Sequence, residues 1–298
     1  MAWPVLAFYG ALVIWAGLLV AALRRSSFKW FMGFGVALML VLNVGYFISG
    51  QPQAIAFFIS IYDVLTNIGI SDNPAELPAA MATCVDNACT TWGDTYETHP
   101  EWAVAFHDRF ANGPVSRRNL LYAHIGFNSI AFVMAHVQLA RPGTGGAANA
   151  RRHRLLGRFG FAAVTLGTLS AVILAGQHSS VEEYGGPLAM IGFWSMAFVV
   201  YGCAVKTAMT ARAGDIASHR IWMFRYLGSM WGAFWLFRVM LFVLDPLLRN
   251  VESAAILICI WFSAPLGVAI AEWWRLRSLR TPVIDARTAT PVGASAAS

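Results

Sequence analysis

Long apolar runs recur along the whole chain and are separated by shorter polar segments. A helix needs about 20 apolar residues to cross the hydrocarbon core of a bilayer, and seven stretches reach that length. They cover about residues 3–23, 30–49, 119–140, 159–177, 187–208, 221–244 and 253–273. A shorter apolar run at about 54–65 contains Asp63 and is predicted to be an interfacial or re-entrant helix after the second span. The pattern therefore predicts an all-α bundle of seven transmembrane helices.

The distribution of charged residues predicts the orientation of these helices. Of the 21 lysines and arginines, all lie on one side of a seven-span bundle except Arg109, Arg117, Arg118, Arg238 and Arg249. Of the 15 carboxylates, all lie at or beyond the opposite side except Asp215, Glu272 and Asp285. Because basic loops stay in the cytoplasm, the N-terminus is predicted outside and the C-terminus inside. A crossing at 54–69 would split the basic loops between the two sides, so an eight-span bundle is rejected.

Composition excludes several classes of protein. The 298 residues are 58% hydrophobic and 12% charged, about half of the ~25% charge of a soluble domain, which excludes a soluble enzyme, a disordered chain and a small disulfide framework. The net charge of +6 belongs to the inner face, where it suits anionic lipid head groups and gives no evidence for nucleic acid. Residues 1–280 are predicted to form one domain in a bacterial inner membrane, and 281–298, rich in Ala, Ser, Thr and Pro, a disordered cytoplasmic tail.

Residues 70–118 form the one large polar segment and are predicted to be an extracytoplasmic loop. The loop contains the sequence Cys84-Val-Asp-Asn-Ala-Cys89. A pair with this spacing holds a metal in a reducing compartment, but the predicted position outside the membrane favours a disulfide between Cys84 and Cys89. The aromatic residues of the loop are typical of an amphipathic surface helix at about 100–111, or of a lid over a pocket between the helices.

The third span carries polar side chains along one face. The positions that share this face, at steps of three and four, are His124, Asn128, Ala131, Ala135 and Gln138. Polar groups in hydrocarbon are costly and normally face the interior of a bundle, so the stripe predicts an internal binding site that includes Asn128 and Gln138. His136 lies roughly 18 Å beyond His124 along the helix, which places the two histidines near opposite faces of the membrane.

Small residues follow one face of the fourth span. They are Gly160, Val164, Gly167, Ala171 and Ala175, and His178 ends the stripe at the outer surface. Small residues at this spacing allow the backbone of a neighbouring helix to approach closely. The same smooth face would also admit a flat cofactor. The pattern leaves both interpretations open.

Arg238 lies about two-thirds of the way out along the sixth span. An arginine inside a membrane is expected to have a partner. Asp245 and Asp63 are candidates for a structural ion pair. The alternative is an anion-binding role for Arg238, toward a carboxylate, a haem propionate or a phosphate.

The histidines fall into two layers by depth. His124 and His178 are predicted near the outer face, and His136, His153 and His219 near the inner face. Histidines on different helices, paired at two depths, hold two haems in transmembrane b-type cytochromes, because haem iron accepts imidazole as an axial ligand. Haem b is therefore the predicted cofactor, held by His124 with His178 and by His136 with His219 or His153. Alternatively, His153 and His219 begin Arg-rich segments, where they bind lipid phosphates or cap carbonyl groups.

These features together resemble a known family, the "domain of unknown function 2306" family of bacterial membrane proteins. The resemblance covers residues 119–245. It rests on His124, Gln138, His153-Arg154-Leu-Leu-Gly157-Arg158, His219-Arg220-Ile-Trp222-Met223-Phe-Arg225 and Phe237-Arg238. It implies a multi-helix inner-membrane protein and brings no activity with it. The similarity to two-haem b-type cytochromes is looser, since those proteins place both ligands of each pair within the spans.

Three functions are consistent with this sequence. The first is a membrane oxidoreductase or electron carrier that exchanges electrons with a quinone or another small molecule in the membrane or at its outer face. The second is a non-redox transporter or sensor, in which His124 and Arg238 bind a small anion or relay protons. The third is an assembly subunit that docks a partner through the outer loop. No nucleotide-binding, metalloprotease or serine-hydrolase motif is present.

Overall fold

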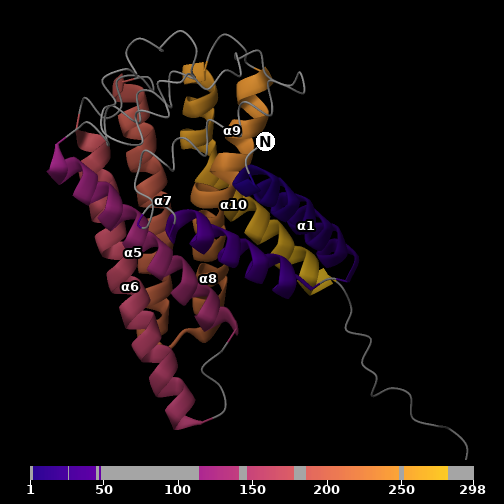
Figure 1. The fold of residues 1–298 in the computed structure, drawn as a ribbon. Helices are drawn as coiled ribbons and strands as arrows, with labels where there is room; N and C mark the ends of the chain where they lie inside the picture. Colours follow the sequence, from indigo (N-terminus) through magenta and orange to yellow (C-terminus); the bar gives the residue numbers. More distant parts are fainter. Residues whose placement is uncertain are drawn as a thin grey trace, which may run out of the picture.

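The structure is a computed structural model that describes residues 3–25, 27–44, 47, 114–140, 146–177, 186–247 and 252–280. Within these ranges the secondary structure is helical and contains no strand. The elements are α1 (Trp3–Arg25), a helix over Lys29–Val44, α5 (Val115–Ala140), α6 (Ala147–Gly176), α7 (Gly186–Arg212), α8 (Ile216–Trp231), the π-helical turn η5 (Gly232–Leu236), α9 (Phe237–Leu247) and α10 (Glu252–Arg280) (Figure 1). The predicted all-helical class is confirmed.

Five of the described helices are long and apolar enough to cross a membrane. They are Leu6–Arg24, Val115–Ala140, Ala147–Gly176, Gly186–Arg212 and Ala254–Arg277. A shorter apolar helix covers Lys29–Val44. These lengths suit a multi-pass membrane protein. The predicted interfacial helix at 54–65 lies outside the described residues.

The sixth predicted span is one helix interrupted by a π-turn. Trp231 (φ −61°, ψ −38°) and Phe237 (φ −52°, ψ −50°) flank η5 and both keep right-handed helical dihedrals. The chain therefore runs as a helix from Ile216 to Leu247. Single π-turns inside helices are often found at functional sites, and this one ends just before Arg238.

Helices α5 and α6 are tied together at both ends. At one end Gln138 Nε2 donates to the backbone oxygen of His153 at 2.9 Å. At the other end Arg117 Nε donates to Gln177 Oε1 at 2.8 Å. The two helices are therefore antiparallel neighbours along their length.

Side chains of α5 pack directly against glycines of α6. A methyl group added to Gly167 would lie 2.6 Å from Asn128 Oδ1, and one added to Gly157 would lie 2.8 Å from Gln138 Nε2. Such distances are much shorter than ordinary packing contacts, so a larger residue at either position would require the Asn128 or Gln138 amide to move. Along the described part of the small-residue face, α5 therefore occupies the space that a flat cofactor would need, which supports the helix-packing interpretation.

Helices α8 and α10 cross at a point where both have glycine, so their backbones come into close contact. Gly228 and Gly232 form a Gly-x-x-x-Gly pair on α8 and η5, and they face Gly267 of α10. A methyl group on Gly267 would lie 2.7 Å from Gly232 Cα and closer still to the backbone oxygen of Gly228. Figure 1 shows α10 changing direction part-way along its length, and Pro265 lies inside this helix, where a proline removes a backbone hydrogen bond and bends the helix.

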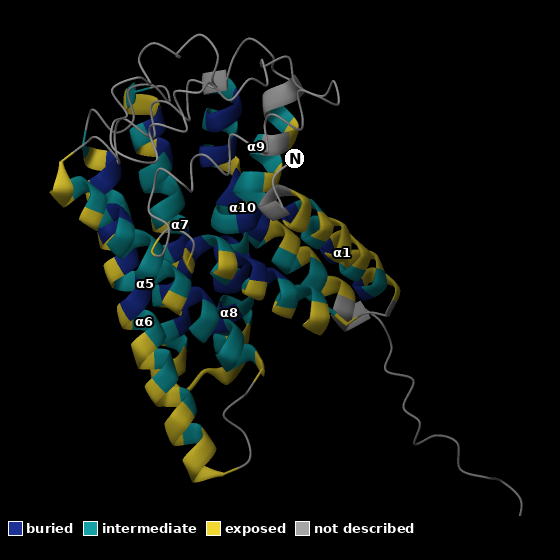
Figure 2. Cartoon of the chain, viewed as in Figure 1, coloured by how far each residue is buried: buried dark blue, intermediate teal, exposed yellow. Residues whose placement is uncertain are grey.

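The centre of the bundle is an aromatic cluster, made of Trp15, Phe31, Phe132, Trp231, Phe234 and Trp235. Trp15 and Trp235 have ring centres 4.4 Å apart. The three indole N–H groups donate to the Phe31 oxygen, the His136 ring and the Gly35 oxygen. Because each buried donor has an acceptor, the large rings pack without the cost of an unsatisfied polar group. The buried residues form the inner core in Figure 2.

Asp215 caps the start of α8. We expect its carboxylate to contribute to the stability of the protein in a way that depends on pH. Its Oδ1 accepts from the Ser218 backbone N–H at 3.0 Å, and hydrogen bonds from Ser218 lower the pKa of this carboxyl group. The stabilisation is therefore complete above the ordinary carboxyl pKa of about 4 and is lost as the pH falls through the lower pKa of the folded protein. We expect Asp215→Ala to lower the melting temperature at pH 7, and the difference from the natural protein to shrink below pH 4.

The matched control for this prediction is Asp215→Asn. Asparagine caps a helix about as well as aspartate but carries no charge. We expect this variant to stay close to the natural protein at pH 7 and to show no acid-dependent difference from Asp215→Ala. A difference between the natural protein and Asp215→Ala that stays constant from pH 7 to pH 3 would contradict the assignment.

Candidate functional site

The basic helix ends meet at one end of the bundle, which we call the basic end. It is formed by the starts of α6 and α8 and the last turns of α7 and α10. Three contacts join these segments: His219 with Thr207, His153 with His219, and Arg225 with Glu272. The described lysines and arginines of these segments are Arg151, Arg152, Arg154, Arg158, Lys206, Arg212, Arg220, Arg225, Arg275 and Arg277.

Two predicted ligands, His153 of α6 and His219 of α8, come together at the basic end. Their ring centres are 6.4 Å apart and the ring planes cross at 84°. His219 Nδ1 lies 3.0 Å from the backbone oxygen of Thr207. A carbonyl oxygen only accepts hydrogen bonds, so Nδ1 donates to Thr207. A histidine that binds a metal through Nε2 is commonly oriented in this way by its other nitrogen.

Local sequence explains how these two histidines are held. Asp215 caps α8, and the His219 backbone N–H donates to the Asp215 backbone oxygen at 2.9 Å, so the imidazole projects from the first turn of that helix. On the other side, Gln138 of α5 binds the backbone oxygen of His153. Gln138 was predicted as a binding residue, and the structure places its amide on the backbone beneath the His153 side chain.

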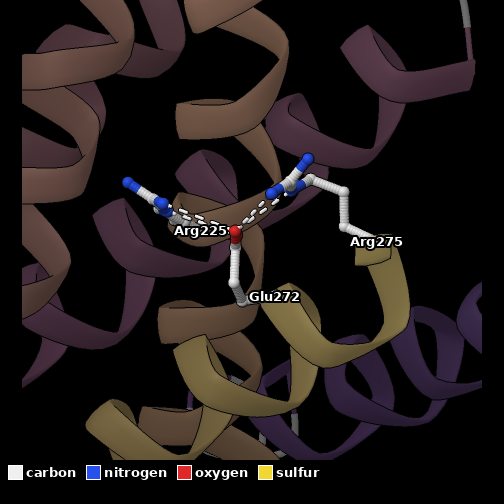
Figure 3. Close-up of polar contacts among 3 residues, drawn as sticks. All are labelled: Arg225, Glu272 and Arg275. Carbon is white, nitrogen blue, oxygen red and sulfur yellow. Dashed lines mark hydrogen bonds and ion pairs between the residues drawn. The ribbon is translucent and has the colours of Figure 1, made fainter. Parts of the chain in front are cut away.

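Glu272 joins α8 to α10 within the basic end, as Figure 3 shows. Its carboxylate accepts from Arg225 Nε at 3.3 Å and from Arg275 Nη2 at 2.5 Å. Arg225 also stacks over the Trp222 ring, with its central carbon 4.6 Å from the ring centre. The carboxylate balances only one of the two guanidinium charges, so this part of the basic end remains positive.

His136, the predicted inner ligand of α5, uses both ring nitrogens inside the protein. Nδ1 lies 2.7 Å from the Phe132 backbone oxygen and donates to it. Nε2 accepts from Trp231 Nε1 at 3.0 Å. The imidazole is therefore neutral, in one defined tautomer, and its accepting nitrogen is covered by an indole. A metal at Nε2 would have to displace Trp231.

His124 lies at the opposite end of the α5 stripe and makes two alternative contacts through Nδ1. This atom is 3.0 Å from Asn128 Nδ2 and 3.2 Å from the Gly167 oxygen. It accepts from the amide in one tautomer and donates to the carbonyl in the other, so both tautomers have a partner. Nε2 makes no hydrogen bond to any residue that the structure describes. The predicted partner of His124, His178, lies outside the described residues.

Arg238 of α9 is near enough to act electrostatically on His124. Its Nη1 donates to the Phe234 backbone oxygen at 2.8 Å, and its central carbon lies 4.0 Å from the centre of the Phe234 ring. The described contacts of Arg238 are thus with Phe234 of the π-turn. The predicted ion pair of Arg238 stays a prediction, because both candidate partners, Asp63 and the side chain of Asp245, lie outside the described residues.

The loop predictions also fall outside the described residues. These are the disulfide between Cys84 and Cys89, and the surface helix or lid at about 100–111. The other two cysteines, Cys203 and Cys259, are buried and form no disulfide among the described residues.

Trp231 and the aromatic cluster were not predicted from the sequence. The available signal was the spacing of Trp231 and Trp235, which are one helical turn apart and therefore share a face. The Gly228-Ser-Met-Trp-Gly232 pattern was a second missed signal, because it is typical of close helix crossings. Neither pattern says that an indole would bind His136, since that contact joins residues 95 apart in the chain.

His153 and His219, with ring centres 6.4 Å apart, are the two residues that would hold a haem iron between the starts of α6 and α8. No group of three or more His, Cys, Asp or Glu side chains that could hold a metal occurs among the described residues. Structural zinc needs four ligands, whereas haem brings its own four nitrogens. Arg154 and Arg220, directly after the two histidines, suit anionic propionates.

Comparisons with known proteins bring no further assignment, since no family model, no curated protein and no solved structure matches this chain. The resemblance to the family of unknown function therefore stays a prediction.

Proposed function

We propose that this protein is a multi-pass membrane electron carrier that binds haem b at its basic end, where His153 and His219 would hold the iron. The observation that carries the proposal is the pair of crossed imidazoles at 6.4 Å, one of them oriented by the Thr207 carbonyl. The haem would supply one-electron redox chemistry. The protein would supply the two ligands, the orientation of His219 and the positive charges for the propionates.

We further propose seven membrane crossings with the N-terminus outside and the basic end in the cytoplasm of a bacterial cell. Helix covers most of each predicted span within the described residues. Two side chain–backbone contacts and one ion pair hold the basic helix ends together. Because basic segments stay cytoplasmic, the haem would lie at the inner membrane surface. A quinone or another small membrane-dissolved molecule is the proposed redox partner.

The absorption spectrum of the detergent-purified chain tests this proposal. We expect a Soret band that shifts on reduction with dithionite, with about one haem per chain. His153→Ala and His219→Ala are each expected to remove it. His219→Met tests ligation more finely, because methionine ligates haem iron and raises its reduction potential. This variant is expected to keep haem with a higher midpoint potential.

The matched control is His136→Gln, which removes a histidine of the same half of the bundle. Its ring nitrogens already bind Phe132 and Trp231, so the variant is expected to keep the haem spectrum. A well-folded natural protein without haem would overturn the proposal and leave His124 and Arg238, with their anion or proton role, as the residues to test. Loss of haem in His136→Gln but not in His219→Ala would overturn the ligand assignment.

A further inference from the structure

One face of α6 is apolar and exposed along most of the helix. The exposed large side chains of this face are Leu155, Phe159, Leu166, Leu169 and Ile173. Their spacing of three, four and seven residues places them on one side of a helix. The opposite side carries Gly157 and Gly167, which pack against α5. Within the described part of the chain, this apolar face has no protein partner.

The start of α6 adds positive charge to the same face. Arg151 and Arg158 are seven residues apart, which is about two turns, and they lie on the side of the helix that carries Leu155. Both side chains are exposed and make no ion pair with a described residue. Figures 1 and 2 show that this end of α6 projects beyond the neighbouring helices and is mostly exposed.

The face therefore changes from apolar to positively charged within a short distance. Arg151 and Leu155 are four residues apart, about 6 Å along the axis. An arginine stem can also lie along an apolar surface while its guanidinium stays at the polar boundary. The molecule that matches this order of chemistry is an amphiphile with an anionic head and long apolar chains.

We infer that this face of α6 is a binding site for one anionic phospholipid. Its acyl chains lie along Leu155, Phe159 and the apolar residues that follow. Its phosphate contacts Arg151 and Arg158, which offer planar groups of N–H donors suited to phosphate oxygens. The site differs from the proposed haem site in its residues, since it uses Arg151 and Arg158 and neither His153 nor His219.

Native mass spectrometry of the full-length chain in detergent tests the site. The probes are phosphatidylglycerol and phosphatidylcholine with the same acyl chains. We expect tight binding of one phosphatidylglycerol and weak binding of phosphatidylcholine. Arg151→Gln with Arg158→Gln is expected to weaken phosphatidylglycerol binding by roughly 30-fold, taking about 1 kcal/mol for each arginine near the membrane surface.

The matched control is Lys206→Gln with Arg212→Gln. It removes the same charge from exposed positions of the basic end that lie on α7. We expect its phosphatidylglycerol affinity to stay within about threefold of the natural protein. Equal weakening in the two double variants would show a general attraction of charges and would overturn a defined site.

The apolar part of the site is tested by Leu155→Gln with Phe159→Gln. Both side chains are exposed, so the fold is expected to tolerate the change, whereas phosphatidylglycerol binding is expected to fall. Inorganic phosphate is expected not to compete, because it lacks the acyl chains. Competition by inorganic phosphate, equal binding of phosphatidylcholine, or a dimer that disappears in the Leu155→Gln, Phe159→Gln variant would each overturn the lipid assignment.

Discussion

Gly267→Ala is expected to destabilise the protein by about 3 kcal/mol, at the upper end of the usual cost of overpacking. The added methyl group would meet Gly232 Cα at 2.7 Å and the Gly232 nitrogen at 2.8 Å. These are backbone atoms of a packed helix, and they cannot move aside as the end of a flexible side chain can. Helices α8 and α10 would have to separate along the whole crossing. Unfolding in mixed micelles with increasing dodecyl sulfate measures the change.

Gly202→Ala is the matched control for the crossing. Gly202 lies inside α7, and a methyl group added there would have no side chain or neighbouring helix of the described residues within 4 Å. Alanine favours a helix over glycine by up to about 1 kcal/mol, so this variant is expected to be as stable as the natural protein or more stable. Similar losses in Gly202→Ala and Gly267→Ala would show that the effect does not come from the close approach of α8 and α10.

Phe132→Ala is expected to cost about 3–5 kcal/mol, the usual range for removing a large buried aromatic side chain. Phe132 is 1% exposed. Its ring centre lies 4.4 Å from that of His136 and 5.6 Å from that of Trp231. The substitution leaves a cavity in the aromatic cluster and removes the packing that holds the His136–Trp231 hydrogen bond. The same detergent unfolding experiment measures the loss.

Phe198→Ala is the control for the aromatic cluster. Phe198 lies on α7 and is 59% exposed, so its ring contacts few protein atoms. We expect a change within about 0.5 kcal/mol. A loss in Phe132→Ala no larger than that in Phe198→Ala would show that the cluster is not the stabilising core of the bundle.

The helical elements follow from hydropathy, but their ends do not. The apolar pattern predicts a fourth helix from about residue 159, whereas α6 begins at Ala147. The earlier turns contain arginine, leucine and alanine, which favour helix, but their charge hides them from a search for apolar runs. The same holds for the sixth span, which extends from Ile216 to Leu247 and not only from about 221 to 244.

For the polar stripe of α5, the sequence predicts which residues share a face but not which groups they contact. Spacing places His124, Asn128 and Gln138 on one face, and the structure turns that face toward α6. The partners are decided by glycines on the other helix, which leave room for Asn128 and Gln138. Depth along the helix predicted a ligand role for His136, but its ring nitrogens bind Phe132 and Trp231.

By itself, the sequence determined that this chain is a bundle of apolar helices with its positive charge at one end, because hydropathy and charge are properties of each segment alone. Only the tertiary structure decided that His153 meets His219, that Trp231 covers His136, and that bare backbones meet at Gly228, Gly232 and Gly267. Each of these contacts depends on the rotation and depth of one helix relative to another. Side-chain packing between helices sets these two quantities, and no single segment encodes them.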